Sequence, residues 1–431
     1  MTNRKVYLDN ACTSIVQPAV LAAADRYTDL YRNSTKSASD VTRECRTYLE
    51  TAREASAKLI GCGAHEIALI EGTSHGLGII AGLLPLTKDD NILVADLEYQ
   101  ASVLCFVPRQ KAIGFEIREV KTRNGELSLA DFKKYFDDHT RAIVVAAVQE
   151  INGWRTDIRE IADFLAGKNC YLIVDGVQEA GAMQVNVKET GADFYCAGGK
   201  KWIGNPFGKG FLYVKEELIP RFEPAFYSYF KIEMRGGYRD YITYLEDPAR
   251  DPFDEYELIQ KASKFENGGY DNYLGALGLT EAIDLQLSIG TEKIEKRIKE
   301  LAKRYMDGLD RLGLRTNSSR DDVHRSGIVA FNFGFRNGSI ERERRLIPFL
   351  QERNIYVSLR SSTGVGGIRT SIHYYNTEED IDALLAGIRD FLEQEKQAGA
   401  RFEPVLPGAP QPVFSGLDSC APGWPPALPL A

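Results

Sequence analysis

The chain has 431 residues, 44% of them hydrophobic, and a formal net charge of −8. Its length allows two domains with a large buried core, and its acidic balance argues against a nucleic-acid partner. No apolar run reaches the ~18 residues that span a bilayer, so we expect no membrane association and no signal peptide.

Seven short apolar runs predict the strands of one sheet. They lie at residues 67–71, 92–95, 115–120, 142–148, 171–174, 194–197 and 210–214. Amphipathic stretches separate several of them, which favours an α/β fold with a mostly parallel seven-stranded sheet covered on both faces. We predict a large domain over residues 15–260, with residues 216–260 as a long insert over the site. Candidates there for shaping the substrate, or for simple aromatic packing, are Tyr227, Tyr229, Phe230 and Arg235.

The pattern changes towards the C-terminus. Helical stretches at 272–289 and 291–312 precede a strand at 327–333, a helix at 340–352, strands at 355–359 and 367–371, and a helix at 377–394. Residues 1–14 and 261–396 are therefore predicted to form a smaller α+β domain. Eight of the 17 prolines lie between Pro404 and Pro429, so residues 397–431 are predicted to be a disordered tail.

Asp175 and Lys201 form the most informative pair in the chain, because each follows a predicted buried strand. The carboxyl ends of parallel strands share the rim at which open α/β sheets bind ligands. A lysine amine forms a Schiff base with an aldehyde, and a carboxylate keeps a pyridine nitrogen protonated so that the ring accepts electrons. Taken alone, such a pair is more often a structural ion pair, and the order of the signals around it favours the cofactor instead.

Two further segments lie at the same predicted rim. Residues 71–76 join a strand to a helix, and Thr73 and Ser74 there offer free backbone N–H groups and a positive helix end to a phosphate. A simple helix N-cap is the alternative. Tyr99 follows the second strand and offers an aromatic face to a flat ring, or packs at the rim.

In this order the motifs resemble the class V aminotransferases, fold-type I pyridoxal-phosphate enzymes that include cysteine desulfurases, isopenicillin N epimerases and C–S lyases. The resemblance covers about residues 5–395. It is carried by residues 7–11, 72–74, 98–99, 175–178, 200–202, 265–268 and 368–377. It implies pyridoxal 5′-phosphate as cofactor, a small amino-acid substrate, and a homodimer with active sites at its interface.

The resemblance also implies individual roles. The implied cofactor-binding residues are Thr73, Ser74, Tyr99, Glu150, Asp175, Gln178, Lys200, Lys201, Gly269 and Tyr270. Lys201 matches the Schiff-base lysine and, with Tyr99, is the catalytic candidate. Asp175 matches the partner of the pyridinium nitrogen, and Gln178 matches the partner of the phenolic oxygen. Gly269 and Tyr270 match a segment that reaches the neighbouring subunit's phosphate.

Substrate binding is assigned in the same way. Arg369 matches the arginine that clamps the substrate carboxylate, a pairing suited to a bidentate guanidinium. Arg360 and Asn10 are further substrate-binding candidates. Glu150 stands where relatives carry an asparagine, and a carboxylate there should repel the phenolate unless it is protonated or turned away; it is otherwise a solvated loop residue.

The seven cysteines are scattered and include no Cys-x-x-Cys pair, which favours a reduced, cytoplasmic protein without a metal site. Desulfurases carry a thiol on a loop before the clamping arginine, whereas residues 360–367 contain no cysteine. They also have a histidine where this chain has Tyr99. These departures argue against a persulfide-forming cysteine desulfurase.

The favoured function is therefore removal of the substrate α-proton followed by β- or γ-elimination, as in a C–S lyase. An amino-acid epimerase or an aminotransferase would share the same carbanion, and the sequence does not decide its fate. A cofactor-binding scaffold without turnover is a weaker alternative. A nucleotide-binding oxidoreductase is weaker still, since no Gly-x-Gly-x-x-Gly follows an early strand.

Overall fold

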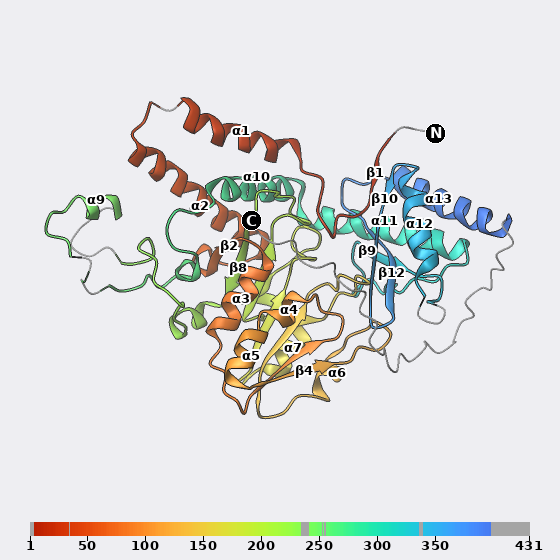
Figure 1. The fold of residues 1–431 in the computed structure, drawn as a ribbon, viewed down its shortest axis with the longest axis horizontal. Coiled ribbons are helices and arrows are strands. Elements are labelled where there is room, and N and C mark those ends of the chain that lie inside the picture. The colour runs from red at the N-terminus through yellow and green to blue at the C-terminus, as the bar shows by residue number, and fades with distance from the viewer. Residues whose placement is uncertain are drawn as a thin grey trace, which may run out of the picture.

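The computed structural model describes residues 4–33, 35–233, 241–251, 253, 256–335 and 339–397. Within these ranges the chain forms one large mixed α/β unit and a smaller unit at one end (Figure 1). Arg235 and the predicted tail from residue 398 onward lie outside the described residues. No helix in the described ranges is both long and apolar enough to cross a bilayer.

The large unit is organised around a seven-stranded sheet. Its strands are β2 (Ile67–Ile70), β3 (Asn91–Ala95), β4 (Glu116–Val120), β5 (Thr140–Ala146), β6 (Tyr171–Asp175), β7 (Phe194–Gly198) and β8 (Gly210–Val214). They are ordered β2-β8-β7-β6-β5-β3-β4, and β8 runs in the opposite direction to the other six strands. All seven predicted runs form strands, so the predicted fold class is confirmed.

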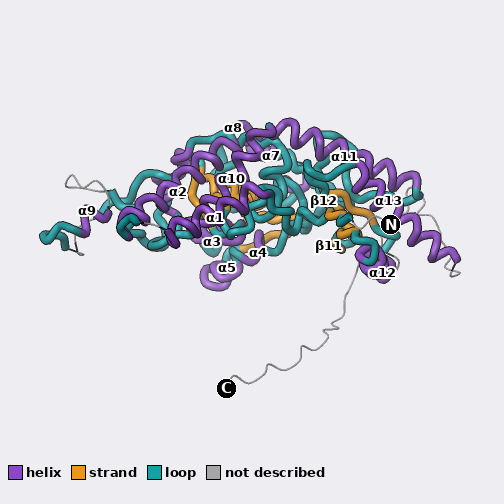
Figure 2. The backbone as a smooth tube through the Cα atoms, turned by 90° about the horizontal axis from the view of Figure 1, so that it is seen from above, coloured by secondary structure: helices purple, strands orange, loops and turns teal. Residues whose placement is uncertain are grey.

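Helices cover both faces of this sheet. In β3, Leu93 packs in a core with α2 (Ala38–Ile60) and α10 (Tyr273–Ile289), whereas Ile92 packs in an opposite core with α3 (Thr73–Leu83). Successive strand residues point to opposite faces, so a continuous apolar run is what a doubly covered sheet requires. Figure 2 shows the strands between these two helical layers.

The remaining helices of the large unit are mostly short. They are α1 (Pro18–Asn33), α4 (Ala101–Leu104), α5 (Val107–Ile113), α6 (Leu129–Lys133), α7 (Ile158–Leu165), α8 (Val187–Thr190) and α9 (Tyr241–Leu245). Buried residues of α10 belong to the core of the large sheet. The predicted domain boundary at residue 261 therefore assigns α10 to the wrong unit, because its apolar face packs against α2.

The small unit contains a three-stranded antiparallel sheet in the order β11-β12-β9. Its elements are α11 (Thr291–Arg311), β9 (Ile328–Phe331), α12 (Glu341–Gln351), β10 (Ile355–Tyr356), β11 (Ser358–Ser362), β12 (Val365–Ser371) and α13 (Glu378–Gln397). The chain start joins it, because β1 (Val6–Tyr7) pairs in parallel with β10 and Asp9 bridges to Ser371. The chain start is thereby fixed beside β12.

A buried ion cluster fixes the segment that follows the long insert. The Glu266 carboxylate accepts hydrogen bonds from Arg53 at 2.9 and 2.7 Å, from Lys231 at 2.5 Å and from the Leu69 N–H at 2.8 Å. The Glu266 side chain is fully buried. It therefore ties α2 and β2 to the chain that leads into α10.

Replacement of Glu266 by alanine is expected to lower the free energy of unfolding by about 3–5 kcal/mol, because Lys231 would lose its ion pair and the buried Arg53 would keep only Glu50. Burial raises the pKa of Glu266, but Arg53 and Lys231 outweigh it and lower the pKa to about 2. This stabilisation is present above the ordinary glutamate pKa of about 4.3 and is lost as the pH falls towards 2. Urea denaturation from pH 7 down to pH 2 measures both effects.

The control for this prediction is Glu281→Ala, which breaks the exposed ion pair with Arg26. Exposed pairs contribute about 0–1 kcal/mol, so this variant should unfold close to the wild type. Equal effects of the two substitutions would contradict the role given to the buried cluster.

Candidate functional site

A cavity of about 540 Å³ opens at the carboxyl ends of β6 and β7 and is closed on one side by β11 and β12. The predicted site residues that line it are Thr73, Ser74, Tyr99, Glu150, Asp175, Lys200, Lys201, Arg360 and Arg369. Segments from the start, middle and end of the chain thus meet at one place. The cavity lies at the strand ends where an open α/β sheet binds its ligands.

Asp175 and Lys201 face this cavity from neighbouring strand ends. Asp175 ends β6, is 4% exposed and accepts a 2.9 Å hydrogen bond from the Val177 N–H. Burial raises the pKa of Asp175, opposed by the Val177 N–H and by Lys201. Burial also lowers the pKa of Lys201, opposed by Asp175 and Glu150. No ion pair between described residues joins Asp175 to Lys201, so the two groups act on each other across the cavity.

The N-terminus of α3 forms one wall. Thr73 is its first residue, and the Thr73 hydroxyl accepts a 2.9 Å hydrogen bond from the Gly198 N–H at the end of β7. A Cβ at Gly198 would lie 3.3 Å from the Thr73 nitrogen, so glycine permits this close approach. In the described chain the N–H groups of Thr73 and Ser74 have no backbone acceptor. They and the helix dipole favour an anion at this wall.

Arg369, on β12, is 1% exposed and already paired with internal carboxylates. It donates to the Glu150 carboxylate at 3.1 Å, to Asp9 at 3.2 Å and to the Ser358 hydroxyl at 3.2 Å. Glu150 is therefore turned towards the guanidinium. An incoming carboxylate that binds Arg369 must compete with Glu150 and Asp9. Arg360 donates to the Leu359 carbonyl at 2.8 Å and lines the same cavity.

Tyr99 stands at the mouth of the cavity with its side chain 51% exposed. Its ring centroid lies 5.7 Å from the Lys201 Nζ, so the aromatic face and the amine share one space. The preceding Glu98 carboxylate accepts hydrogen bonds from the Ala146 N–H at 2.9 Å and from Gln149 at 2.7 Å. Burial raises the pKa of Glu98 to about 8, opposed by these two hydrogen bonds.

Asn10 and Gln178 do not line the cavity. Internal hydrogen bonds occupy both side-chain amides. Asn10 is fully buried and donates to the Ser371 carbonyl at 2.8 Å, and its contact with substrate stays a prediction. Gln178 donates to the Ala11 carbonyl at 3.2 Å and accepts from the Trp202 indole at 2.7 Å. Its bonding to a cofactor oxygen stays a prediction.

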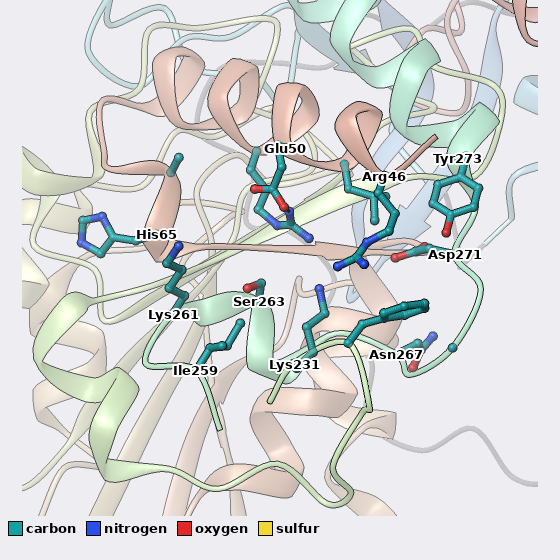
Figure 3. A pocket seen from close by; sticks show the side chains of 15 residues that line it. Arg46, Glu50, His65, Lys231, Ile259, Lys261, Ser263, Asn267, Asp271 and Tyr273 are labelled. Atoms are coloured by element: carbon teal, nitrogen blue, oxygen red, sulfur yellow. Dashed lines mark hydrogen bonds and ion pairs between the residues drawn. The ribbon is translucent and has the colours of Figure 1, made fainter. Parts of the chain in front are cut away.

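A second cavity of about 150 Å³ lies beside α2 (Figure 3). Gly269 and Phe230 line this cavity and not the larger one, and the Tyr270 side chain is 75% exposed. Tyr227 and Tyr229 line neither cavity. The described insert residues therefore do not reach the Lys201 cavity of the same chain.

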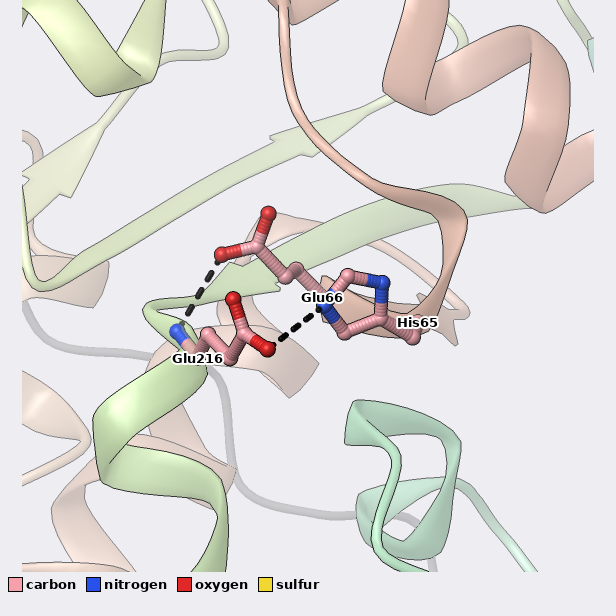
Figure 4. Close-up of side chains that lie close together, drawn as sticks. All are labelled: His65, Glu66 and Glu216. Atoms are coloured by element: carbon pink, nitrogen blue, oxygen red, sulfur yellow. Dashed lines mark hydrogen bonds and ion pairs between the residues drawn. The ribbon is translucent and has the colours of Figure 1, made fainter.

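His65, Glu66 and Glu216 bring three metal-ligand side chains close together (Figure 4). The Glu66 carboxylate, however, accepts hydrogen bonds from the Gly63 N–H at 2.9 Å and from the Glu216 N–H at 3.1 Å. It also accepts one from Lys188 at 2.5 Å. These hydrogen bonds satisfy the buried Glu66 carboxylate, which thereby links the segments that contain Gly63, Lys188 and Glu216.

A family model described as aminotransferase class-V matches residues 6–384. The chain belongs to this family. Its fold is that of the fold-type I pyridoxal-phosphate enzymes, and its predicted membership is confirmed. It is therefore a pyridoxal-phosphate-dependent enzyme, and pyridoxal phosphate is its cofactor.

Relatives within the class V family span nearly the whole chain. A probable cysteine desulfurase from Pyrococcus abyssi is 27% identical over 401 residues, which cover 91% of this chain and 96% of that protein. The apo structure of a cysteine desulfurase from Thermococcus onnurineus NA1 superposes with a TM-score of 0.77 at 26% identity, covering 91% and 96%. C-DES, in a structure with glycine covalently linked to its PLP cofactor, has the same fold, with a TM-score of 0.77 at 20% identity, covering 90% and 97%.

These relatives correct the function expected from the sequence. The expectation that a persulfide-forming cysteine desulfurase is unlikely is wrong, because relatives that span nearly the whole chain are named cysteine desulfurases. The preference for β- or γ-elimination over this reaction falls with it. The expectation depends on the lack of a cysteine in residues 360–367. That argument considers one loop only, and Cys12, from the start of the chain, also lines the Lys201 cavity.

The cavity fits pyridoxal phosphate on two observations. Asp175 and Lys201 face each other across it without an ion pair, the first group suited to a ring nitrogen and the second to an aldehyde. The free N–H groups at the start of α3 suit a phosphate. Lys209, buried nearby, is neutralised by Glu71 and Asp271, so it anchors this wall rather than adding free charge.

Sequence reasoning gave no role to Cys12 or to Glu98, although Glu98 belongs to a segment that carries the resemblance. Cys12 follows the Asn10-Ala11 pair that the resemblance itself identified, so its position in the motif was a usable signal. Glu98 precedes Tyr99, but its burial depends on contacts with β5 and Gln149. The local sequence pattern does not predict these contacts.

Proposed function

We propose that the protein is a cysteine desulfurase, which cleaves the Cβ–Sγ bond of a cysteine-type amino acid and leaves alanine. The observation that carries the proposal is the cavity in which Lys201, Asp175, Arg369 and Cys12 converge. The similarity of nearly the whole chain to proteins named cysteine desulfurases supports the same chemistry.

The proposed roles follow from the positions of the side chains. Lys201 would hold the cofactor covalently, Asp175 would bond the ring nitrogen, Tyr99 would cover one ring face, and the start of α3 would bind the phosphate. Once bound, pyridoxal phosphate supplies an aldehyde carbon that combines with amines and a ring that accepts an electron pair. A buried Asp175 carboxylate strengthens the bond to a cationic ring because little water competes with it.

Lys201 also suits proton transfer at the substrate α-carbon. Burial lowers the pKa of Lys201, so its free amine is available nearer to neutral pH than that of an exposed lysine. Arg369 would orient the substrate by binding its carboxylate, displacing Glu150 or Asp9 from the guanidinium. This exchange replaces one charge-assisted pair by another and keeps the buried arginine neutralised.

We also propose a homodimer in the cytoplasm. Gly269 and the exposed Tyr270 lie away from the Lys201 cavity of their own chain, as residues that serve a neighbouring subunit would. The described cysteines are free thiols, which fits a reducing compartment. Analytical ultracentrifugation of the purified protein tests the homodimer, and we expect a mass of twice that of the chain.

The function is tested by incubating the holoenzyme with L-cysteine and an excess of a small thiol reductant. We expect one alanine and one sulfide per cysteine, while two molecules of reductant become one disulfide. Pyruvate and ammonia in place of alanine would reveal elimination and contradict the proposal. A mass-spectrometric amino-acid assay separates the two outcomes in a single reaction.

A further inference from the structure

Cys12 is the one exposed cysteine among those that the structure describes. Cys45, Cys170 and Cys196 are buried, Cys62 and Cys105 are partly buried, and none of these five lines the Lys201 cavity. The cavity itself is built for a ligand, because the nearly buried Asp175 and the unpaired Lys201 both face it. Cys12 therefore offers a reachable thiol inside a binding site.

Burial raises the pKa of four of the other thiols. Burial raises the pKa of Cys62, Cys105 and Cys170 to about 12 in each case. Burial also raises the pKa of Cys196, well above its ordinary value. Because the thiolate is the nucleophile, burial disfavours the reactive form of these four cysteines at neutral pH.

The segment around Cys12 is held across the cavity wall at both ends. At one end Asp9 accepts from Arg369 at 3.2 Å, and at the other the Ser14 N–H donates to the Lys200 carbonyl at 3.2 Å. Between them the Cys12 N–H donates to the Asp9 carbonyl at 3.1 Å, which makes a turn. The backbone of Cys12 is thereby held between the proposed carboxylate clamp and the segment after β7 that carries Lys201.

The hairpin before Arg369 has no equivalent group. Residues 358–362 and 365–369 pair in antiparallel register, with Arg360 opposite Gly367 and Ser361 opposite Gly366. This hairpin contains no cysteine. Any thiol that takes part in the reaction must reach the cavity from another element, and Cys12 does so from the chain start.

We propose that Cys12 is the catalytic thiol that receives the substrate sulfur, a role that rests on the proposed desulfurase function. The Cys12 thiolate attacks the substrate Sγ and forms an S–S bond while the Cβ–Sγ bond breaks. The electron pair of that bond stays with Cβ, which takes a proton, so cysteine and the Cys12 thiol become alanine and a Cys12 persulfide. Two equivalents of an external thiol then release sulfide, restore Cys12 and end as one disulfide.

The first test locates the sulfur. The holoenzyme is mixed with L-cysteine in the absence of reductant, alkylated and digested, and the peptides are analysed by mass spectrometry. We expect an alkylated persulfide on Cys12, and alkylation of Cys12 before turnover should be slowed by L-alanine, which occupies the same cavity. A persulfide mapped to any other cysteine, Cys420 included, would overturn the proposal, as would unimpeded alkylation in saturating alanine.

The second test uses a substrate that needs no thiol. L-cysteine sulfinate breaks down into alanine and sulfur dioxide, so its sulfur departs without a nucleophile. Cys12→Ser should lower alanine formation from L-cysteine by at least about 100-fold, because a serine hydroxyl is not ionised at neutral pH. Its alanine formation from the sulfinate should stay within about threefold of the wild type, since the remaining machinery is intact.

The matched control is Cys105→Ser, a partly buried thiol outside the cavity, which should retain both activities. Undiminished L-cysteine turnover in Cys12→Ser would overturn the role of Cys12 and leave the desulfurase function standing. A wild-type holoenzyme that makes no alanine from either substrate would instead refute the proposed function itself. Loss of both activities in Cys12→Ser would also contradict a role specific to sulfur transfer.

Discussion

Lys201→Ala is expected to abolish turnover of L-cysteine, by at least ~10⁴-fold, while the protein still binds pyridoxal phosphate without a covalent bond. Proton transfer by a positioned side chain alone contributes about 10²- to 10⁴-fold, and the same amine is also proposed as the covalent anchor. Asp175 and the start of α3 should remain in place in this variant, because the Val177 N–H holds Asp175 and the Gly198 N–H holds Thr73.

The measurement combines activity with borohydride reduction of the holoenzyme. In the wild type, reduction should fix the cofactor on Lys201, and in Lys201→Ala it should fix none. Lys200→Ala is the matched control, since Lys200 lines the same cavity one residue earlier. Labelling of Lys200 in the wild type, or an active Lys201→Ala, would show that the lysine has been assigned incorrectly.

The positions of Asp175 and Lys201 could be predicted because they depend on local pattern and on one rule of sheet topology. A short apolar run ended by a polar residue indicates a buried parallel strand, and such strand ends converge at one rim. The pairing of β6 with β7 brings them to that rim as expected. The same reasoning placed the start of α3, because a strand followed by small and hydroxylated residues is a local signal.

What could not be predicted depends on contacts between distant segments. Asn10 lies in the motif at residues 7–11, but its amide donates to the Ser371 carbonyl, 361 positions away in the chain. Cys12 enters the cavity because Asp9 and Ser14 are bonded to Arg369 and to Lys200, pairings set by the fold and not by local spacing. The sequence of the loop before Arg369 therefore gives no indication of this thiol.

Arg369→Ala is expected to raise KM for L-cysteine by roughly 30- to 1000-fold, because the loss of a buried charge-assisted pair costs about 2–4 kcal/mol. Arg369→Lys should fall between this variant and the wild type, since lysine keeps the charge but not the bidentate geometry. The visible absorbance of the bound cofactor should change little, because the clamp acts on substrate. Steady-state kinetics and absorbance spectra of the three proteins check these statements.

Glu150 provides the sharper control, because it already holds the guanidinium at 3.1 Å. If the substrate carboxylate displaces it, Glu150→Gln should lower KM by weakening the competitor, while Asp9 continues to pair with Arg369 at 3.2 Å. Arg360→Ala removes a second cation from the same cavity and should change KM only a few-fold. A large rise in KM for Arg360→Ala with an unchanged KM for Arg369→Ala would assign the clamp to Arg360, and Arg369 would then serve only to neutralise Asp9 and Glu150.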